Sequence, residues 1–376
     1  MAVELAWSSI KRQTREQGRV QLLLRAKGDP DTLAKVLWQA GDEVLVASEQ
    51  DTIGAGGYKI AAGPVVIVEP EMVSPAEATQ WYLDLAARLE AEGVSGKLTV
   101  APRTPPPKWL FDAGDSRLIP RTHLLYSVDT TSGSRRVPPE SQHQIAGAVS
   151  DWLHTPGGQG YLSTHAPAFL VDPGTDLTAV MNAMVTQFGF CYALARRAEP
   201  LRVKSVTVHH DARAGLSIWE PGLDWPNLVA QLREPLLWHP ELLDYGFVRT
   251  ITNTWSLFTG DYPMPFNNVS ASPFVWEREY TEMTSRLAYN AVVVPDAHGI
   301  QILTSAHLAK AHDLTAWTIT EVAPDRHLVE APDLAAWYAQ PHPDPTTLAK
   351  ARADFGDMII TEKNIDQYPF RREHLT

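Results

Sequence analysis

The strongest hydrophobic pattern in the chain runs from residue 75 to residue 92. Trp81, Leu85 and Leu89 recur every four residues, which places the three side chains on one face of a helix. Gly93 follows the last turn, and glycine is the usual residue for the left-handed conformation that ends a helix. This segment is therefore predicted to be an amphipathic helix that packs one apolar face against a sheet.

Short apolar runs around this helix have the length and the β-branched content of strands. They are bounded by Gly and Pro, which interrupt regular structure. The predicted strands in this part of the chain cover residues 20–24, 44–47, 65–68, 97–100 and 122–128. Strands that alternate with helices are typical of layered α+β or α/β domains.

The second part of the chain also contains both strand-like and helix-like hydrophobic patterns. Polar and apolar residues alternate over residues 202–210, and residues 216–219 return as a hairpin partner. Residues 291–294 and 300–304 predict a second hairpin. The stretch 176–197 is apolar on more than one face, which predicts a helix at the centre of the fold. Further helices are predicted at residues 141–153, 225–238, 331–339 and 345–355.

These elements predict an α+β fold of mixed α/β layers, in which mainly antiparallel or mixed sheets pack against helices. The chain has 376 residues, enough for two domains. Residues 130–139 are rich in Thr, Ser, Gly, Arg and Pro and form the best candidate linker. We therefore expect an N-terminal α/β domain at 1–135 and a C-terminal α+β domain at 136–376, with an aromatic-rich loop region at 219–276.

One pair of segments resembles an internal repeat. Residues 29–42 and 344–357 share Asp, Pro, Thr, Leu, Ala, Lys, Gly and Asp in an ungapped alignment. A duplicated half would explain this. Two helices that begin and end with the same residue types would explain it as well, and the flanking residues do not match, which favours the second interpretation.

The chain is acidic, with 44 Asp and Glu against 32 Lys and Arg and a formal net charge of -12 at pH 7. Nucleic acids and anionic membrane surfaces attract basic proteins, so neither is an expected partner. Another protein, of basic character, is the favoured partner, and a homo-oligomer is compatible with the sequence. No apolar run reaches the length of about 18 residues that a membrane helix needs.

Cys191 is the single cysteine, so an internal disulfide and a multi-cysteine zinc site are excluded. It falls in an apolar stretch predicted to be helical, where a buried and inert thiol is the expected state. The N-terminal residues lack the basic-then-apolar order of a signal peptide. We expect a reduced, cytoplasmic setting and no cofactor.

His209, His210 and Asp211 form the most suggestive polar cluster. They end a predicted strand and enter a turn, a position where side chains are exposed on a rigid scaffold. One histidine with Asp211 or Glu220 could form the acid–base pair of a hydrolase or transferase. The alternative, which we favour, is a polar hairpin tip without a catalytic role.

Other local motifs predict no metal or nucleotide site. His298, His307 and His312 lack the H-E-x-x-H spacing of a zinc helix. The glycine-rich residues 54–59 lack the spacing of a phosphate-binding loop, and no G-x-S-x-G nucleophile motif is present.

Aromatic residues concentrate between residues 219 and 276. Rigid amphipathic rings in loops rich in Pro and Asn are typical of interaction surfaces, although at least half are expected to serve packing alone. The candidate binding residues are Trp219, Trp225, Trp238, Tyr262 and Phe266.

The sequence thus favours a non-enzymatic protein-binding component that uses an acidic, aromatic-rich surface. An inhibitor or immunity-type protein, an adaptor and an assembly subunit all fit this description. The alternative is a hydrolase or transferase whose site lies around His209, His210 and Asp211.

Overall fold

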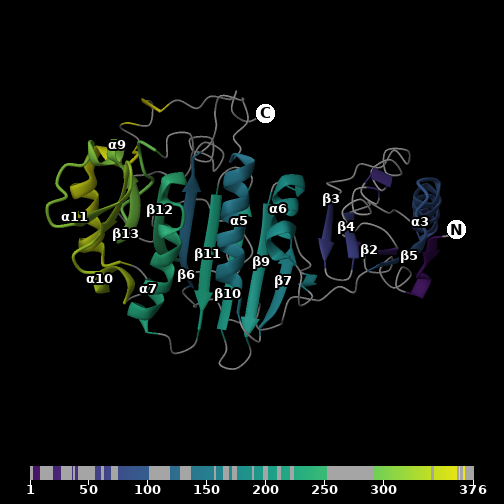
Figure 1. Cartoon of the computed structure of the whole chain (residues 1–376). Coiled ribbons are helices and arrows are strands. Elements are labelled where there is room, and N and C mark those ends of the chain that lie inside the picture. The colour runs from purple at the N-terminus through teal and green to yellow at the C-terminus, as the bar shows by residue number, and fades with distance from the viewer. Residues whose placement is uncertain are drawn as a thin grey trace. The chain divides into compact units, whose positions relative to one another are not determined.

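The computed structural model (Figure 1) describes most, but not all, of the chain. The described residues are 3–8, 20–26, 36, 39–40, 56–60, 63–68, 75–100, 119–127, 137–155, 158–163, 169–171, 176–188, 190–197, 202–209, 213–220, 224–251, 291–339, 343–361, 364 and 367–368. They belong to two compact units, each of which is discontinuous in sequence. The first unit contains Met1–Pro106 and Gln159–Cys191, and the second contains Pro107–Gly158 and Tyr192–Thr376. The predicted linker at 130–139 lies largely outside the described residues, so the boundary near residue 135 stays a prediction.

The first unit contains a mixed sheet with the order β1-β5-β2-β4-β3. β1 pairs parallel with β5, and the other neighbours pair antiparallel. Its strands are β1 (Val3–Leu5), β2 (Val20–Ala26), β3 (Gly56–Ile60), β4 (Gly63–Val68) and β5 (Gly96–Val100). The same unit holds the hairpin β7 (Gln159–Ser163) and β8 (Phe169–Val171), and α6 (Leu177–Phe188) lies against β3.

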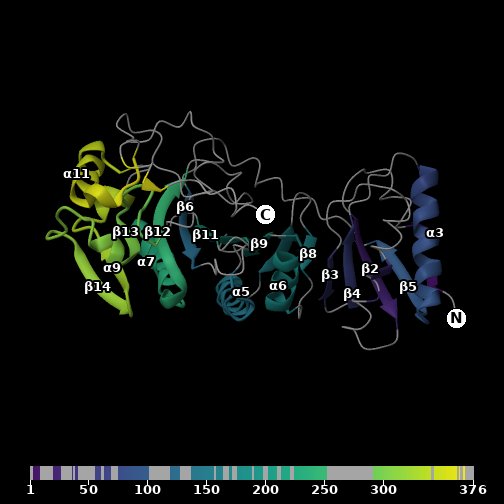
Figure 2. The same ribbon diagram turned by 90° about the horizontal axis from the view of Figure 1, so that it is seen from above.

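α3 (Pro75–Ala91) covers this sheet on the side of β1 and β5 (Figure 2). Trp81, Tyr82, Leu85 and Leu89 form its buried stripe and are at most 3% exposed. Gly93 has φ 78°, so the predicted left-handed end of this helix is confirmed. Burial of the Tyr82 hydroxyl raises the pKa of that phenol above its ordinary value.

The second unit contains a sheet with the order β14-β15-β13-β12-β6-β11-β10-β9. Neighbours from β14 to β10 pair antiparallel. The strands are β6 (Ile119–Tyr126), β9 (Phe190–Arg197, of which residues 192–197 fall in this unit), β10 (Arg202–His209), β11 (Arg213–Trp219), β12 (Leu243–Ile251), β13 (Ile300–Thr304), β14 (Thr318–Ala323) and β15 (Arg326–Glu330). The predicted α+β class is confirmed.

Helices cover both faces of this sheet. α5 (Pro139–Leu153) lies against β10, and α7 (Trp225–Arg233) lies across β6, β11 and β12, as Figure 1 shows. On the opposite face, Leu348, Ala351 and Phe355 of α11 (Pro345–Phe355) join a core cluster with Phe247 and Val329. Short helical turns η1 (Glu234–Leu237), η2 (Pro240–Leu242), η5 (Gly356–Met358), α9 (Ser305–Leu308) and α10 (Ala335–Tyr338) connect the elements.

Two predicted elements are wrong. The helix expected over 176–197 ends at Phe188, and Phe190–Arg197 is strand β9, which lies beside β10. An apolar run fits a buried strand as well as a buried helix, and here pairing with a neighbouring strand decides between them. Cys191 is therefore a strand residue; it is fully buried, and burial raises the pKa of its thiol.

The hairpin expected from residues 291–294 and 300–304 is also absent among the described residues. β13 pairs instead with β12 and β15. Val294 forms an isolated parallel bridge with Ile359. Partners distant in sequence thus replace the local partner, and the β14–β15 hairpin completes this end of the sheet.

Candidate functional site

Among the strands that the structure describes, β14 is the outermost of the second unit, and its first four residues are exposed to solvent. It stands at the end of the strand order and pairs antiparallel with β15, with Ile319 opposite Val329 and Glu321 opposite His327. Residues 318–321 are exposed and the last two residues of the strand are half-buried. Ile319 is 43% exposed and is one of three large hydrophobic side chains exposed among the described residues.

An open edge strand has unused hydrogen-bonding capacity. Alternate residues of β14 pair with β15, and the N–H and C=O groups of the residues between them point outward. Such a row is a template for another strand, and natural proteins usually blunt it with Lys, Pro or a covering helix. The sequence of β14, TITEVA, contains neither Lys nor Pro. Its six residues span about 20 Å at the usual rise per residue.

The edge strand β1 of the first unit shows the usual protection. It has three residues, and the backbone N–H of Val3 donates to the carboxylate of Glu90 on α3 at 2.7 Å. Glu4 forms an ion pair with Lys97 of the neighbouring strand at 2.7 Å. β1 is therefore short, covered by a helix and bordered by charge. β14 is twice as long, with Glu321 as its one charged residue and a register shift between Glu321 and Ala323.

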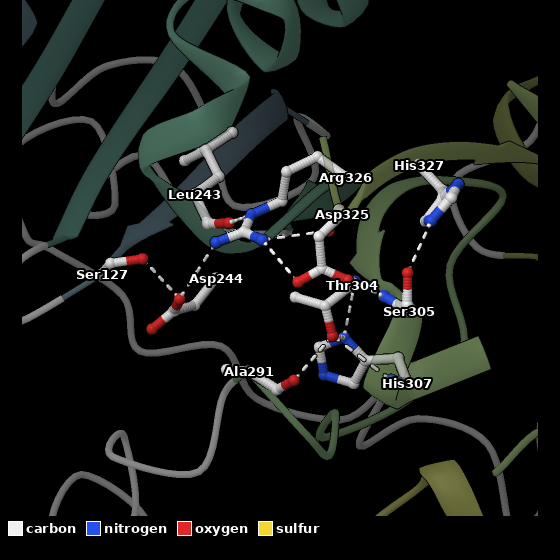
Figure 3. A network of polar contacts seen from close by, with 10 residues as sticks. All are labelled: Ser127, Leu243, Asp244, Ala291, Thr304, Ser305, His307, Asp325, Arg326 and His327. Carbon is white, nitrogen blue, oxygen red and sulfur yellow. Dashed lines mark hydrogen bonds and ion pairs between the residues drawn. The ribbon is translucent and has the colours of Figure 1, made fainter. Parts of the chain in front are cut away.

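The turn between β14 and β15 is held by a polar network centred on Arg326 (Figure 3). Its guanidinium lies 3.0 Å from the carboxylate of Asp325 and 3.7 Å from that of Asp244, and it donates a hydrogen bond to the carbonyl of Leu243. Ser127 donates to Asp244 at 2.5 Å. Arg326 is 13% exposed, so this network fixes the start of β15 against β12 and β6.

Asp325 occupies the turn itself, with φ 61°. Aspartate tolerates this left-handed conformation better than most residues. Hydrogen bonds from the side chain and backbone of Ser305, assisted by Arg326 and His327, hold the pKa of its carboxyl below the ordinary value. The ionised carboxylate accepts the Ser305 N–H at 2.9 Å and so ties the turn to the beginning of α9.

Ser305 and His327 are the one pair in this network with the geometry of a nucleophile and a base. The hydroxyl of Ser305 lies 3.0 Å from Nε2 of His327. Within the described residues, no carboxylate bonds the other ring nitrogen of His327, and the hydroxyl is shared with Asp325. A working dyad needs its base oriented by a third group, so the pair is better explained as part of the turn anchor.

The beginning of α9 is fixed by a reciprocal cap. The hydroxyl of Thr304 accepts the His307 N–H, and Nδ1 of His307 accepts the Thr304 N–H at 3.0 Å. Thr304 also donates to the carbonyl of Ala291 at 2.7 Å. His307, which the sequence did not predict to bind metal, is therefore a buried capping residue of α9. The turn that carries β14 is tied to the beginning of this helix through Ser305.

Of the predicted acid–base residues, the structure describes His209 and Glu220, and it does not bring these two together. His209 ends β10 opposite Arg213, while Glu220 follows β11 at the other end of the same hairpin. Glu220 forms an ion pair with Arg202 at 2.6 Å. His210 and Asp211 lie outside the described residues.

The predicted aromatic surface is only partly described. Trp238 is half-buried and its ring lies edge-on to Trp152, with 6.4 Å between centroids. Trp225 is half-buried at the first residue of α7. The side chain of Trp219 and residues Tyr262 and Phe266 lie outside the described parts. The binding role of these residues therefore stays a prediction.

A second polar group lies in the interior and is called here the buried arginine face. It consists of Arg121 and His123 on β6, Arg213 on β11 and Arg249 on β12, all at most 8% exposed. The guanidinium of Arg121 donates to Thr207 at 2.5 Å and lies over Gly215, where any Cβ would collide with it. Burial, with Arg249, Arg121, His298 and Arg213 nearby, holds the pKa of His123 well below its ordinary value.

The remaining histidines do not assemble a metal centre. His298 is fully buried, and its ring stacks on Phe247 with 4.0 Å between centroids. His312 is exposed. Across the residues that the structure describes, no group of three His, Cys, Asp or Glu side chains could hold a metal ion, and no helix is long and apolar enough to span a bilayer.

The comparisons with known proteins include a weak structural likeness. No protein-family model matches the sequence, and no curated protein matches it. A solved structure described as the Pseudomonas aeruginosa T6SS protein PA0821 aligns with 67% of this chain and 80% of that chain, at 9% identity and a TM-score of 0.33. A TM-score this low does not establish a shared fold.

The β14 edge was missed from the sequence, although a local signal exists. Residues 318–322 are rich in β-branched residues, and Pro324 and Asp325 follow as turn formers. An edge strand exposed on both sides lacks the apolar–polar alternation that marks half-buried strands, and this made the segment inconspicuous.

Proposed function

We propose that this protein is a non-enzymatic binding component that takes an extended segment of a partner protein onto the edge of β14. In such strand addition, main-chain hydrogen bonds supply affinity and alternate side chains supply specificity. The observation that carries the proposal is the exposure of a β-branched strand, on an anchored hairpin, at the edge of the sheet that the described residues form. An inhibitor or immunity-type protein, an adaptor and an assembly subunit would all use such a surface.

Two further features support this role. The turn of the hairpin is fixed by Asp325, Arg326 and Ser305, so little conformational entropy would be lost when a partner strand is added. The net charge of -12 favours association with basic proteins and keeps free copies of the chain apart.

The test compares capture of partners by three forms of the tagged full-length protein: wild type, Ile319→Lys and Leu83→Lys. Lysine on an edge strand is a natural block to strand addition. Leu83 on α3 is 44% exposed against 43% for Ile319, so Leu83→Lys controls for the same change elsewhere. A stoichiometric partner that wild type and Leu83→Lys retain should be lost with Ile319→Lys, and should leave the wild type as salt rises.

Equal retention by Ile319→Lys would reject the β14 edge as the binding site. No specific observation favours the hydrolase or transferase alternative, because His209 and Glu220 lie at opposite ends of their hairpin. An activity that His209→Ala abolishes without lowering the melting temperature would restore that alternative.

A further inference from the structure

We infer that the segment bound by β14 is basic and runs antiparallel to it, with a Lys or Arg opposite Glu321 and a β-branched residue opposite Ile319. This inference rests on the proposed function and names the chemistry of the partner at the same site. Ile319 and Glu321 are two residues apart on one strand, so their side chains share one face of the sheet.

The β-branched residue that we infer in the bound segment follows from the packing around Ile319. Val329, opposite Ile319 on β15, is fully buried, and Trp317 beside β14 is 8% exposed. Both belong to the core cluster of this end of the sheet. Ile319 thus extends that core to the rim, and an apolar side chain on an added strand would cover it.

The basic half of the pattern follows from Glu321. Its side chain is exposed, and no ion pair within the described residues engages it. The ionised carboxylate of Asp325 lies at the end of the same hairpin, although Arg326 partly balances it. An opposite charge directly across from Glu321 forms a favourable cross-strand pair, whereas a second carboxylate there would repel it.

A second copy of this chain fits the edge less well. Each copy carries a formal charge of -12, so two copies repel at long range. If β14 paired antiparallel with its own copy about Glu321, two carboxylates would face each other. If it paired about Thr320, each Glu321 would lie opposite an isoleucine. Neither register supplies the cation that Glu321 accommodates.

Antiparallel pairing continues the pattern from β14 to β10, and its hydrogen bonds are the more favourable of the two geometries. A bound strand would then present its basic residue two positions before the residue opposite Ile319. The probe that follows from this geometry is a fluorescein-labelled peptide, Thr-Val-Thr-Arg-Thr-Val-Thr. Its matched control replaces the Arg with Glu.

The test measures fluorescence anisotropy of both peptides with the wild-type protein, Glu321→Lys and Glu140→Lys. Glu140 is an exposed acid in the first turn of α5 and controls for the change in net charge. Wild type and Glu140→Lys should prefer the Arg peptide by about two- to fivefold, the range expected for one cross-strand charge pair. Glu321→Lys should prefer the Glu peptide.

Backbone methylation tests strand addition separately from charge. Two versions of the Arg peptide carry N-methyl groups on the two alternate sets of amides. Only one set faces β14, so binding should be lost with one version and kept with the other. This result together with the reversed preference of Glu321→Lys would support the inference.

The failures are distinguishable. Equal binding of the Arg and Glu peptides, with sensitivity to one methylated version, would reject the basic partner and retain strand addition. Binding indifferent to both methylations, or no binding of any peptide at millimolar concentration, would reject strand addition itself. A dimer in sedimentation that Ile319→Lys dissociates and Leu83→Lys does not would assign the edge to a second copy and overturn the basic partner.

Discussion

β6 and β14 belong to the same sheet, yet the first buries polar side chains and the second exposes an apolar one. Every residue from 121 to 126 of β6 is buried, including Arg121, Thr122 and His123. β14 leaves Ile319 exposed at its rim. The central strand β6 thus buries polar side chains, whereas the edge strand β14 exposes an apolar side chain to water.

The difference shows that position in the sheet, and not residue polarity, decides burial here. Burial of a guanidinium costs free energy unless it is hydrogen-bonded. Here Thr207 accepts a hydrogen bond from Arg121, and Gly215 leaves the space that the guanidinium occupies. An exposed isoleucine by itself costs little free energy. On an edge strand with outward-facing backbone N–H and C=O groups, however, it favours aggregation unless a partner covers it. We therefore expect mutations around β6 to act on stability and mutations in β14 to act on binding.

The largest effect on stability is expected from Gly215→Ala. The added Cβ would displace the guanidinium of Arg121 from a site that is 1% exposed and would break its bond to Thr207. Overpacking and the loss of a buried hydrogen bond together should cost about 3 kcal/mol of unfolding free energy. Urea denaturation measures this change.

Gly147→Ala is the matched control, because nothing lies within 4 Å of a Cβ at that position on α5. It should stabilise the protein by about 0.5–1 kcal/mol, as alanine does in helix interiors. An equal gain from Gly215→Ala would show that the guanidinium of Arg121 does not need this glycine.

A smaller effect concerns pH. Because the pKa of His123 is held well below 6.5 in the folded protein, the unfolded chain takes up a proton that the folded chain does not. Stability should therefore be lost as pH falls below about 6.5, by about 1.4 kcal/mol at pH 5.5 for this group. His123→Phe, which retains the stacking on Phe247, should remove this part of the pH dependence.

Urea midpoints of both proteins at pH 7.5 and 5.5 give the comparison. Identical losses would mean that His123 binds a proton in the folded state as readily as in the unfolded chain. His298, the other buried histidine of this region, keeps its own contribution in both proteins.

Most helices and one hairpin were predictable from local sequence, and the long-range pairing was not. The Pro345–Phe355 helix begins where Asp344 caps two backbone N–H groups, and the β10–β11 hairpin follows its alternation. Strand β9 was mistaken for a helix because an apolar run does not reveal its neighbours. Hydrogen-bond partners such as Arg326 and Leu243 are 83 residues apart and leave no local pattern.

The β14 edge could not be predicted from the sequence either, because it too depends on long-range strand pairing. Clusters of His and Asp attract attention as chemistry, whereas an edge is defined by the absence of a neighbouring strand. The sequence TITEVA could equally have formed a central strand, and only the order of the described strands places it outermost.

The smallest stability effect is expected from Ile319→Lys, and this prediction decides whether β14 belongs to the binding side of the comparison. Ile319 is exposed at the rim, and lysine can lay its aliphatic stem along the same surface. The unfolding free energy should therefore change by less than about 0.5 kcal/mol, the usual range for surface positions. Urea denaturation of Ile319→Lys and Leu83→Lys, beside the wild type, measures this change.

A loss of about 2 kcal/mol or more with Ile319→Lys alone would assign the residue to the core of the second unit. Its effect on partner capture could then be a consequence of unfolding, and the edge would lose its main support. An unchanged midpoint with lost capture would instead separate the two roles within one sheet. Stability would then depend on the buried arginine face, and recognition would depend on β14, where a partner strand would cover the exposed Ile319.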